Sequence, residues 1–262
     1  LGVTFIPYAI LPDRFNPDFL WIGTEGQGLI RLNKRTLKRE MFPFFESFAL
    51  ESGEAPGWPR VFSLKQDGEG WLYIGTNLGL TVYNPNEGHY FFYRNDPDNP
   101  RSIPQGRVIS LYNALNGRLW VGTDIGGLAF FDKATKEFTG FRPSTEPGGL
   151  LGHRVNCFFE DRRGNLWVGT NMGLHFMYVS EGRFRAFLES DGLANNMVYG
   201  VLEDRYGHLW LSTNKGLSRF NPRLASFLNF DADDGLPGNE FNTASFSSID
   251  PGRLLFGGVN GL

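Results

Sequence analysis

The sequence has a single cysteine, Cys157, and no long hydrophobic run. One cysteine excludes an internal disulfide framework, a redox pair and a metal site with four cysteine ligands. No stretch reaches the roughly 18 apolar residues that a membrane-spanning helix needs, and the first ten residues, LGVTFIPYAI, have no basic leader region. We therefore expect no membrane span within these 262 residues.

A marked excess of charge is also missing. The chain has 25 Lys and Arg against 28 Asp and Glu, a net charge of -3, which argues against a nucleic-acid footprint over the whole surface. The four histidines show no H-x-x-x-H spacing, and there is no G-x-S-x-G segment and no phosphate-binding glycine loop. We expect no metal, no cofactor and no enzymatic activity in this chain, and we expect Cys157 to be a small core residue rather than a nucleophile.

Turn-forming and aromatic residues are abundant instead. The chain has 34 Gly and 15 Pro, and 15% of its residues are aromatic. Many chain breakers combined with enough apolar residues for a core are typical of a single all-β domain of this length.

One short segment recurs six times along the chain. Its fourth residues are separated by 52, 47, 47, 43 and 45 residues, which is the length of one four-stranded propeller blade. The copies are LWIGT (20–24), LYIGT (72–76), LWVGT (119–123), LWVGT (166–170), LWLST (209–213) and the degenerate LLFGG (254–258).

The repeats predict a β-propeller of four-stranded antiparallel blades. Each copy has an alternating run, a glycine turn, the recurring segment, a Gly-Leu strand and a last aromatic strand. The expected blades are residues 1–48, 49–98, 99–145, 146–190, 191–231 and 232–262, with only the first two strands of the sixth present. The chain starts at Leu1 and stops within a repeat, so we expect it to be a fragment of a larger propeller.

Several positions inside the repeat have structural interpretations. The glycine of the recurring segment lies in mid-strand, which predicts a close backbone approach or a bulge. The tryptophan is expected to wedge between neighbouring blades. The Asp-x-x-Gly turns that begin at Asp67, Asp161 and Asp204 resemble acidic sites, but we expect these aspartates to accept hydrogen bonds from turn amides.

The recurring form V-x-x-x-x-x-D-x-x-G-x-L-W-h-G-T-x-x-G-L, where h is hydrophobic, resembles the two-component regulator propeller repeat. The copies that fit best are VNCFFEDRRGNLWVGTNMGL (155–174) and VYGVLEDRYGHLWLSTNKGL (198–217), and DGLPGNEFN (234–242) is similar to the last repeats of such sensors. The resemblance implies an extracytoplasmic, periplasmic sensor domain of a hybrid histidine kinase, often one that detects oligosaccharides, or of a diguanylate cyclase. The membrane would be reached only through segments outside this chain, and the parent receptor would be a homodimer.

Alignment of the repeats also predicts a binding face. The residue before the valine of each first strand is Arg60, Arg107 and Arg154 in three successive repeats, so these arginines would lie side by side at the mouth of the channel. A cluster of like charges favours an anion such as an acidic sugar. The alternative is that each arginine pairs with a local acidic residue or stacks on the next blade.

The same loops contain other polar and aromatic residues that suit carbohydrate binding. These candidate ligand-binding residues are Trp58, Gln105, His153, Asn195, Asn196, Tyr199, Asn239, Glu240 and Asn242. A second set follows the recurring segment and is so regular that we expect a turn or strand-bridging role for it; it consists of Glu25, Gln27, Asn77, Asp124, Asn171, Asn214 and Asn260.

Three functions remain open from the sequence. The first is a ligand-sensing module of a two-component receptor. The second is a protein-interaction platform, and the third is a propeller lyase or hydrolase, which the absence of paired catalytic residues disfavours.

Overall fold

The computed structural model describes residues 5–42, 59–250 and 252–261. Within these ranges the chain forms 22 β-strands and two short 3-10 helices, which confirms the all-β class. The first three sheets consist of β1 (Pro7–Pro12), β2 (Phe19–Thr24), β3 (Leu29–Asn33), β4 (Arg39–Met41), β5 (Val61–Gln66), β6 (Leu72–Thr76), β7 (Gly79–Asn84), β8 (His89–Tyr93), β9 (Val108–Asn113), β10 (Leu119–Thr123), β11 (Leu128–Asp132) and β12 (Glu137–Phe141).

The second half of the chain continues the same order. Its elements are β13 (Val155–Glu160), β14 (Leu166–Thr170), β15 (Gly173–Tyr178), β16 (Arg183–Phe187), η1 (Glu189–Asp191), β17 (Val198–Glu203), β18 (Leu209–Thr213), β19 (Gly216–Asn221), β20 (Ser226–Phe230), η2 (Ala232–Asp234), β21 (Phe241–Asp250) and β22 (Arg253–Gly258). Among the described residues, five sheets have four strands in sequential antiparallel order and the sixth contains only β21 and β22.

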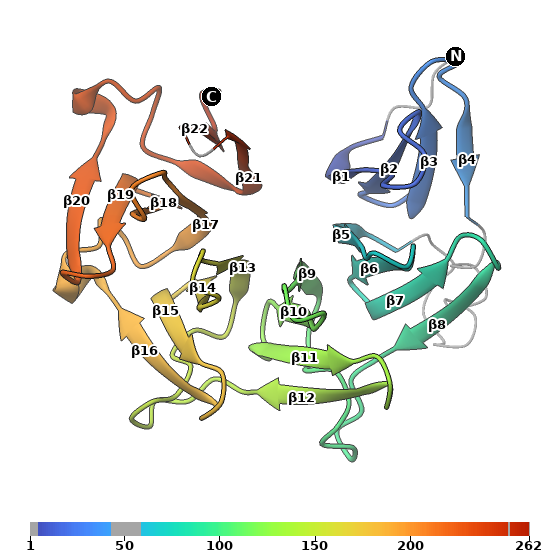
Figure 1. Ribbon diagram of the computed structural model, residues 1–262, viewed down its shortest axis with the longest axis horizontal. Coiled ribbons are helices and arrows are strands. Elements are labelled where there is room, and N and C mark those ends of the chain that lie inside the picture. The colour runs from blue at the N-terminus through green and yellow to red at the C-terminus, as the bar shows by residue number, and fades with distance from the viewer. Residues whose placement is uncertain (1–4, 43–58, 251, 262) are drawn as a thin grey trace.

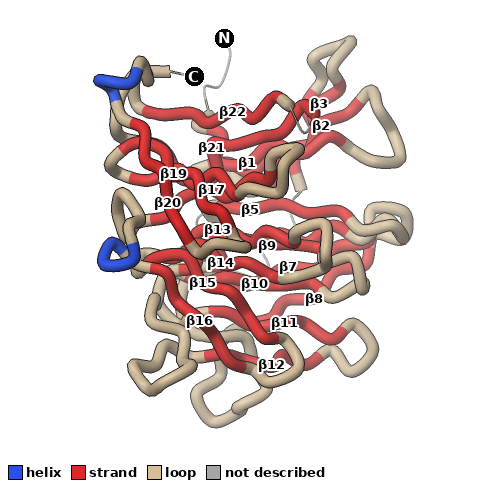
Figure 2. The backbone as a smooth tube through the Cα atoms, turned by 60° about the vertical axis from the view of Figure 1, so that its left-hand side comes forward, coloured by secondary structure: helices blue, strands red, loops and turns tan. Residues whose placement is uncertain are grey.

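The sheets form an open ring around one axis. Figure 1 shows the first strand of each sheet innermost, with the sheet of β1–β4 and the pair β21–β22 on either side of the opening. Each innermost strand packs against the next one along the chain, from β1 through β21. The two 3-10 helices lie on the same side of the ring, each in the connection to the next innermost strand (Figure 2). The chain therefore has a β-propeller fold, and each sheet lies within one of the residue ranges expected for a blade.

The mid-strand glycine of each of the first four repeats faces the next blade. A methyl group at Gly169 in β14 would lie 2.5 Å from the Cys157 sulfur and 2.9 Å from the Val198 Cγ1 atom of β17. Gly23 meets Val61 in the same way, at 2.5 Å from its Cγ1 atom. The expected close approach is confirmed, because the missing side chain lets the first valine of the next innermost strand come into contact.

We expect the Gly169→Ala variant to lower the free energy of unfolding by about 2 kcal/mol, since the added methyl group overpacks an interface between blades. Urea unfolding monitored by tryptophan fluorescence would measure this change. Gly68→Ala is the matched control, because a methyl group there has no heavy atom within 4 Å and the backbone is not in the left-handed region. Equal unfolding midpoints for the two variants would contradict the packing argument.

The aromatic residue of the recurring segment packs against the following blade, as expected. Trp120 in β10 shares a core cluster with Phe158 of β13, and the ring centroids are 6.4 Å apart. Trp167 in β14 contacts Phe220 of β19 at 5.7 Å between centroids. Trp120 and Trp167 are 2% and 3% exposed, so these rings contribute to the core and are not ligand platforms.

The hairpin turns between the first two strands of the second, fourth and fifth blades have buried or partly buried aspartates. In Asp161, Oδ1 accepts the amides of Arg163 and Asn165 at 2.9 and 3.0 Å, which confirms the turn role expected from the sequence. Its other oxygen, Oδ2, accepts the indole N–H of Trp167 at 3.0 Å. One carboxylate therefore fixes the turn and orients the tryptophan of its own repeat, six residues later.

This contact recurs in other blades. The Asp204 carboxylate accepts the indole N–H of Trp210 at 3.0 Å, and Asp67 accepts the phenol of Tyr73 at 2.9 Å. In the third blade, alanine (Ala114) stands at the position of the aspartate. The spacing of Asp and Trp in the repeat thus has a direct hydrogen-bonding cause.

Candidate functional site

The three predicted arginines lie at equivalent places, directly before β5, β9 and β13. The backbone of each arginine forms two hydrogen bonds with one polar residue in the loop after the second strand of its blade. The amides of Arg60, Arg107 and Arg154 donate to the side-chain oxygens of Asn77, Asp124 and Asn171 at 2.8, 2.7 and 3.0 Å, and the amides of those three residues donate back to the arginine carbonyls at 3.2, 3.2 and 3.1 Å. The strand-bridging role expected for these three polar residues is therefore observed. We call the side of the ring that contains them the arginine face.

Every one of the three guanidinium groups has a local partner. Arg107 Nε lies 2.6 Å from the Asp124 carboxylate, which is 10% exposed, and Arg60 lies 3.9 Å from Glu25. Arg154 donates to the Asn156 side chain at 2.8 Å. The contacts of Arg60 and Arg107 match the alternative of pairing with a local acidic residue, whereas the partner of Arg154 is a neutral amide.

The ring of Tyr8, in β1 of the first blade, packs against the second blade. It stacks on Phe62, with centroids 5.4 Å apart and planes 14° from parallel, and the Arg107 guanidinium lies 5.5 Å from the centroid of Phe62. Burial and a hydrogen bond with Glu25 raise the pKa of Tyr8, and the nearby charges of Arg60 and Arg107 partly oppose this rise. Arg60 and Arg107 therefore both act on the same phenol at the mouth of the channel.

The asparagines expected to bind ligand fasten the loops that precede β17 and β21. Asn196 accepts the Glu189 amide at 2.9 Å, and Asn195 donates to the Glu189 carboxylate at 3.0 Å. Asn239 accepts the Ala232 amide at 2.8 Å in the equivalent loop of the next repeat. Each of these contacts stabilises a connection that includes a 3-10 helix.

The remaining predicted residues are spread over the same face. His153 is exposed, with its ring 3.2 Å from the Asn171 amide nitrogen, and the phenol of Tyr199 donates to Asn214 at 2.9 Å. The Glu240 carbonyl accepts the amide of Val259 at 3.1 Å. Trp58 lies outside the described residues.

Two adjoining cavities open on the arginine face between the second and third blades. Their volumes are about 450 and 680 Å³, and Asn95, Gln105 and Ile125 line both of them. The smaller cavity also contains Arg107 and Asp124. We call the two cavities together the interblade groove.

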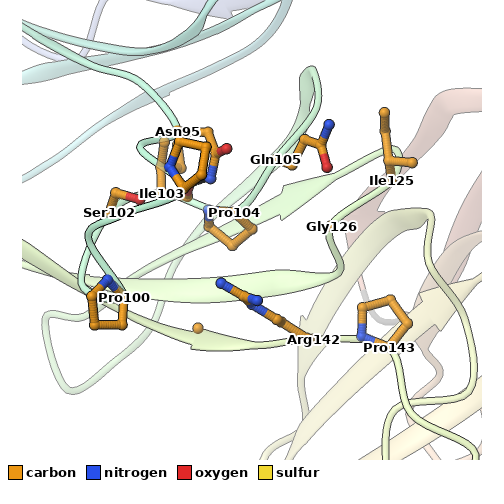
Figure 3. Close-up of a pocket in the computed structure, with 12 residues that line it drawn as sticks. Asn95, Pro100, Ser102, Ile103, Pro104, Gln105, Ile125, Gly126, Arg142 and Pro143 are labelled. Atoms are coloured by element: carbon orange, nitrogen blue, oxygen red, sulfur yellow. Dashed lines mark hydrogen bonds between the residues drawn. The ribbon is translucent and has the colours of Figure 1, made fainter.

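The larger cavity has a rigid wall and a charged floor. Figure 3 shows Pro100, Pro104 and Pro143 around it, with the side chain of Arg142 extending from the end of β12 toward Pro100. Arg142 is exposed and forms no ion pair with any residue in the described part of the chain. Ile125 is 53% exposed and supplies an apolar surface at the rim. Arg142, Asn95 and Ile125 were not among the residues singled out from the sequence.

Groups that could support other chemistry are in the core or are dispersed. Cys157 is 3% exposed, as expected of a core residue, and burial raises the pKa of its thiol to about 12. Over residues 5–42, 59–250 and 252–261, no group of three His, Cys, Asp or Glu side chains is placed to hold a metal ion. In the same ranges, no helix has the length and apolar character needed to cross a membrane.

Comparison with solved structures relates the fold to three other chains. The extracellular domain of BT3049 from B. thetaiotaomicron, described as a hybrid two-component system, has a TM-score of 0.78 and 23% identity, over 96% of this chain and 32% of that one. PorZ from Porphyromonas gingivalis, a surface component of the type-IX secretion system, has a TM-score of 0.74 and 18% identity, over 100% and 39%. An ancestral GH74 enzyme has a TM-score of 0.70 and 12% identity, over 99% and 37%.

The chain thus spans about a third of the length of the first two solved chains. A search of curated proteins finds no significant match. The family model described as "Two component regulator propeller" matches residues 149–172 and 192–215, which include the LWVGT and LWLST segments. The chain therefore carries repeats of the two-component regulator propeller family on a β-propeller fold.

Proposed function

We propose that this chain is the extracytoplasmic ligand-sensing domain of a two-component receptor of the hybrid histidine kinase type, and that it recognises an acidic oligosaccharide in the interblade groove. The receptor is periplasmic in this proposal, and it reaches the membrane and its homodimeric partner through segments outside this chain. The family repeats and the fold shared with an extracellular domain of such a system support the sensor role.

The observation that carries the proposal is the composition of the interblade groove. Each of its two cavities has a volume within the range of about 300–1,000 Å³ that small-molecule sites occupy. Asn95 and Gln105 offer amide groups to sugar hydroxyls, and Ile125 offers an apolar surface to the face of a sugar ring. A concave, partly apolar surface with a few polar groups suits carbohydrate binding.

The charge of the groove favours an acidic ligand. Asp124 already neutralises Arg107, whereas Arg142 in the larger cavity has no carboxylate partner among the described residues. A guanidinium without a partner binds a carboxylate or sulfate through two parallel hydrogen bonds. We therefore assign the main anion contact to Arg142. In this proposal it takes the role that repeat alignment gave to Arg60, Arg107 and Arg154.

The role of the chain in signalling would be a shift between receptor states. A ligand shifts the balance between two receptor conformations by the difference in its affinity for them. Binding alone, without turnover, is therefore sufficient to change the output. We propose no catalytic activity for this chain and no nucleic-acid ligand. The same sensing role would serve a diguanylate cyclase output.

We expect Arg142→Ala to weaken binding of a trigalacturonate at least tenfold, since the ligand carboxylate loses its guanidinium partner. Isothermal titration calorimetry measures this, with maltotriose as the neutral comparison. Arg107→Ala should weaken binding less, because Asp124 already pairs with that arginine. Arg163→Ala is the control variant, because Arg163 is exposed on the opposite side of the ring and only its backbone amide contacts Asp161.

Equal affinity of Arg142→Ala and the unmodified chain would overturn the assignment of the anion contact. Failure of the chain to bind any acidic or neutral oligosaccharide would overturn the glycan proposal itself.

A protein-binding role is the second candidate, and one aromatic patch favours it. Tyr90 and Phe91 of β8 are 39% and 36% exposed, and Trp71 lies 6.2 Å from Phe91 between ring centroids. Exposed aromatic side chains are enriched in interfaces between proteins. Loss of a captured partner on Phe91→Ser, with unchanged glycan binding, would support this role over the first.

A further inference from the structure

The innermost strands place equivalent side chains around the axis of the ring. Val61, Val108, Val155 and Val198 each pair with the threonine that ends the second strand of their blade, so the four strands share one register. The fifth residues of these strands are Lys65, Tyr112, Phe159 and Leu202. Three of the four blades therefore present an apolar or aromatic side chain at this level, and the second blade presents a lysine.

These side chains line a central cavity that is separate from the interblade groove. Its volume is about 410 Å³, and all six innermost strands contribute to its wall. Each strand contributes at least one lining residue. Examples are Tyr8 of β1, Lys65 of β5, Tyr112 of β9, Phe159 of β13, Leu202 of β17 and Phe246 of β21. The six strands that enclose this space are those nearest the axis in Figure 1.

Lys65 brings the only formal charge to the wall of this cavity, as far as the structure describes it. No Asp, Glu or Arg lines it, and the ionisable groups besides Lys65 are Tyr8, Tyr112 and Cys157. The side chain of Lys65 has no hydrogen bond or ion pair within the described ranges, and burial lowers the pKa of its ammonium group.

The acidic residues one position further along the innermost strands are engaged elsewhere. Glu160 accepts the Leu115 amide of the previous blade at 2.9 Å. Glu203 accepts the amide of Arg162 at 3.3 Å and lies 3.4 Å from its guanidinium. These carboxylates join neighbouring blades through their turns, so Lys65 is left as a partly buried cation in an aromatic cavity.

We propose that the central cavity is a second binding site, and that it takes a small organic anion whose carboxylate pairs with Lys65 while its planar body contacts Tyr112 and Phe159. A partly buried cation costs free energy unless an anion or other polar partner compensates it. A ligand carboxylate supplies that compensation, and the aromatic wall excludes highly hydrated inorganic anions. The site does not depend on the interblade groove or on its proposed glycan.

Benzoate is the probe for this site, and benzyl alcohol is the neutral comparison of similar shape. We expect the 262-residue chain to bind benzoate, and Lys65→Met to weaken that binding at least tenfold while its weak affinity for benzyl alcohol is unchanged. Lys215→Met is the matched control, because Lys215 is exposed in the loop after β18 and lies outside the cavity. Arg142→Ala should bind benzoate normally, which separates this site from the interblade groove.

A second measurement does not depend on the fold of a variant. Reductive ¹³C-methylation labels the lysines of the unmodified chain, and benzoate should shift the Lys65 resonance and raise the pKa of its amine. Absence of benzoate binding by the unmodified chain would overturn the proposal. Binding that leaves the Lys65 resonance unmoved, or that persists in Lys65→Met, would overturn it as well.

Discussion

Replacing Asp161 with alanine is expected to lower the free energy of unfolding by about 4 kcal/mol, the largest effect of any single substitution considered for this chain. The carboxylate is 7% exposed and accepts hydrogen bonds from two turn amides, the Asn165 side chain and the Trp167 indole. Bonds to a charged group contribute about 1.5–3 kcal/mol each at most, and a buried donor left without a partner costs about 1–3 kcal/mol. Urea unfolding of the variant would measure the change.

Two further substitutions sharpen this test. Asp161→Asn retains one acceptor oxygen for the turn amides but presents an N–H₂ group to the Trp167 indole, so we expect a loss between zero and that of alanine. Ala114→Asp adds the carboxylate at the equivalent position of the third blade, six residues before Trp120, and should not destabilise the chain. A loss below about 1 kcal/mol for Asp161→Ala would contradict the hydrogen-bonding role.

His175 is expected to make stability depend on pH between about 4 and 6.5. Its ring is fully buried in β15, its Nε2 atom accepts the Leu151 amide at 3.3 Å, and it contacts Phe184 edge-on. Burial lowers its pKa from 6.5 to about 4, with slight opposition from the backbone of Gly173. The folded chain therefore keeps this histidine neutral at pH values where the unfolded chain protonates it.

The sign of the effect follows from proton uptake. Below pH 6.5 the unfolded state binds a proton that the folded state does not bind. The contribution of His175 to the free energy of unfolding is therefore fully present above about pH 7. It falls by about 3 kcal/mol in total as the pH drops toward 4. His175→Gln keeps an acceptor for the Leu151 amide and should remove this slope, whereas His153→Gln, at an exposed position, should retain it. Denaturant unfolding at several pH values measures both, and an unchanged slope in His175→Gln would refute the assignment.

Most of the fold could be predicted from the repeats because their spacing reflects contacts that recur in each blade. The tryptophan, the glycine and the aspartate of the recurring form each have one physical task, and Asp161, Trp167 and Gly169 show all three within a single blade. The turn role of the aspartate was foreseen, but its bond to the indole was not, because a turn signature says nothing about side chains six residues away.

The candidate site was less accessible to this reasoning. Repeat alignment identifies Arg107 as the residue before an innermost strand, yet its partner Asp124 comes from another loop, and alignment does not show which way a side chain turns. Arg142 and the proline-rich wall of the interblade groove occupy connections that differ between repeats. Comparison of equivalent positions in the repeats cannot identify residues that have no equivalent in the other repeats. The groove was therefore found only from the structure.

The fifth blade reaches the same interblade fit by exchanging two residues. In blade four, Cys157 faces Gly169 across the first two strands, whereas in blade five Gly200 faces Ser212. Gly200 leaves room for Phe246 of the last sheet, whose Cγ atom would lie 2.7 Å from an added methyl group. What is constrained is thus the combined bulk of two facing positions. Anyone who transfers the residue at one of these positions from one blade to another must therefore transfer the residue that faces it on the paired strand as well. Otherwise the blade will not pack against its neighbour.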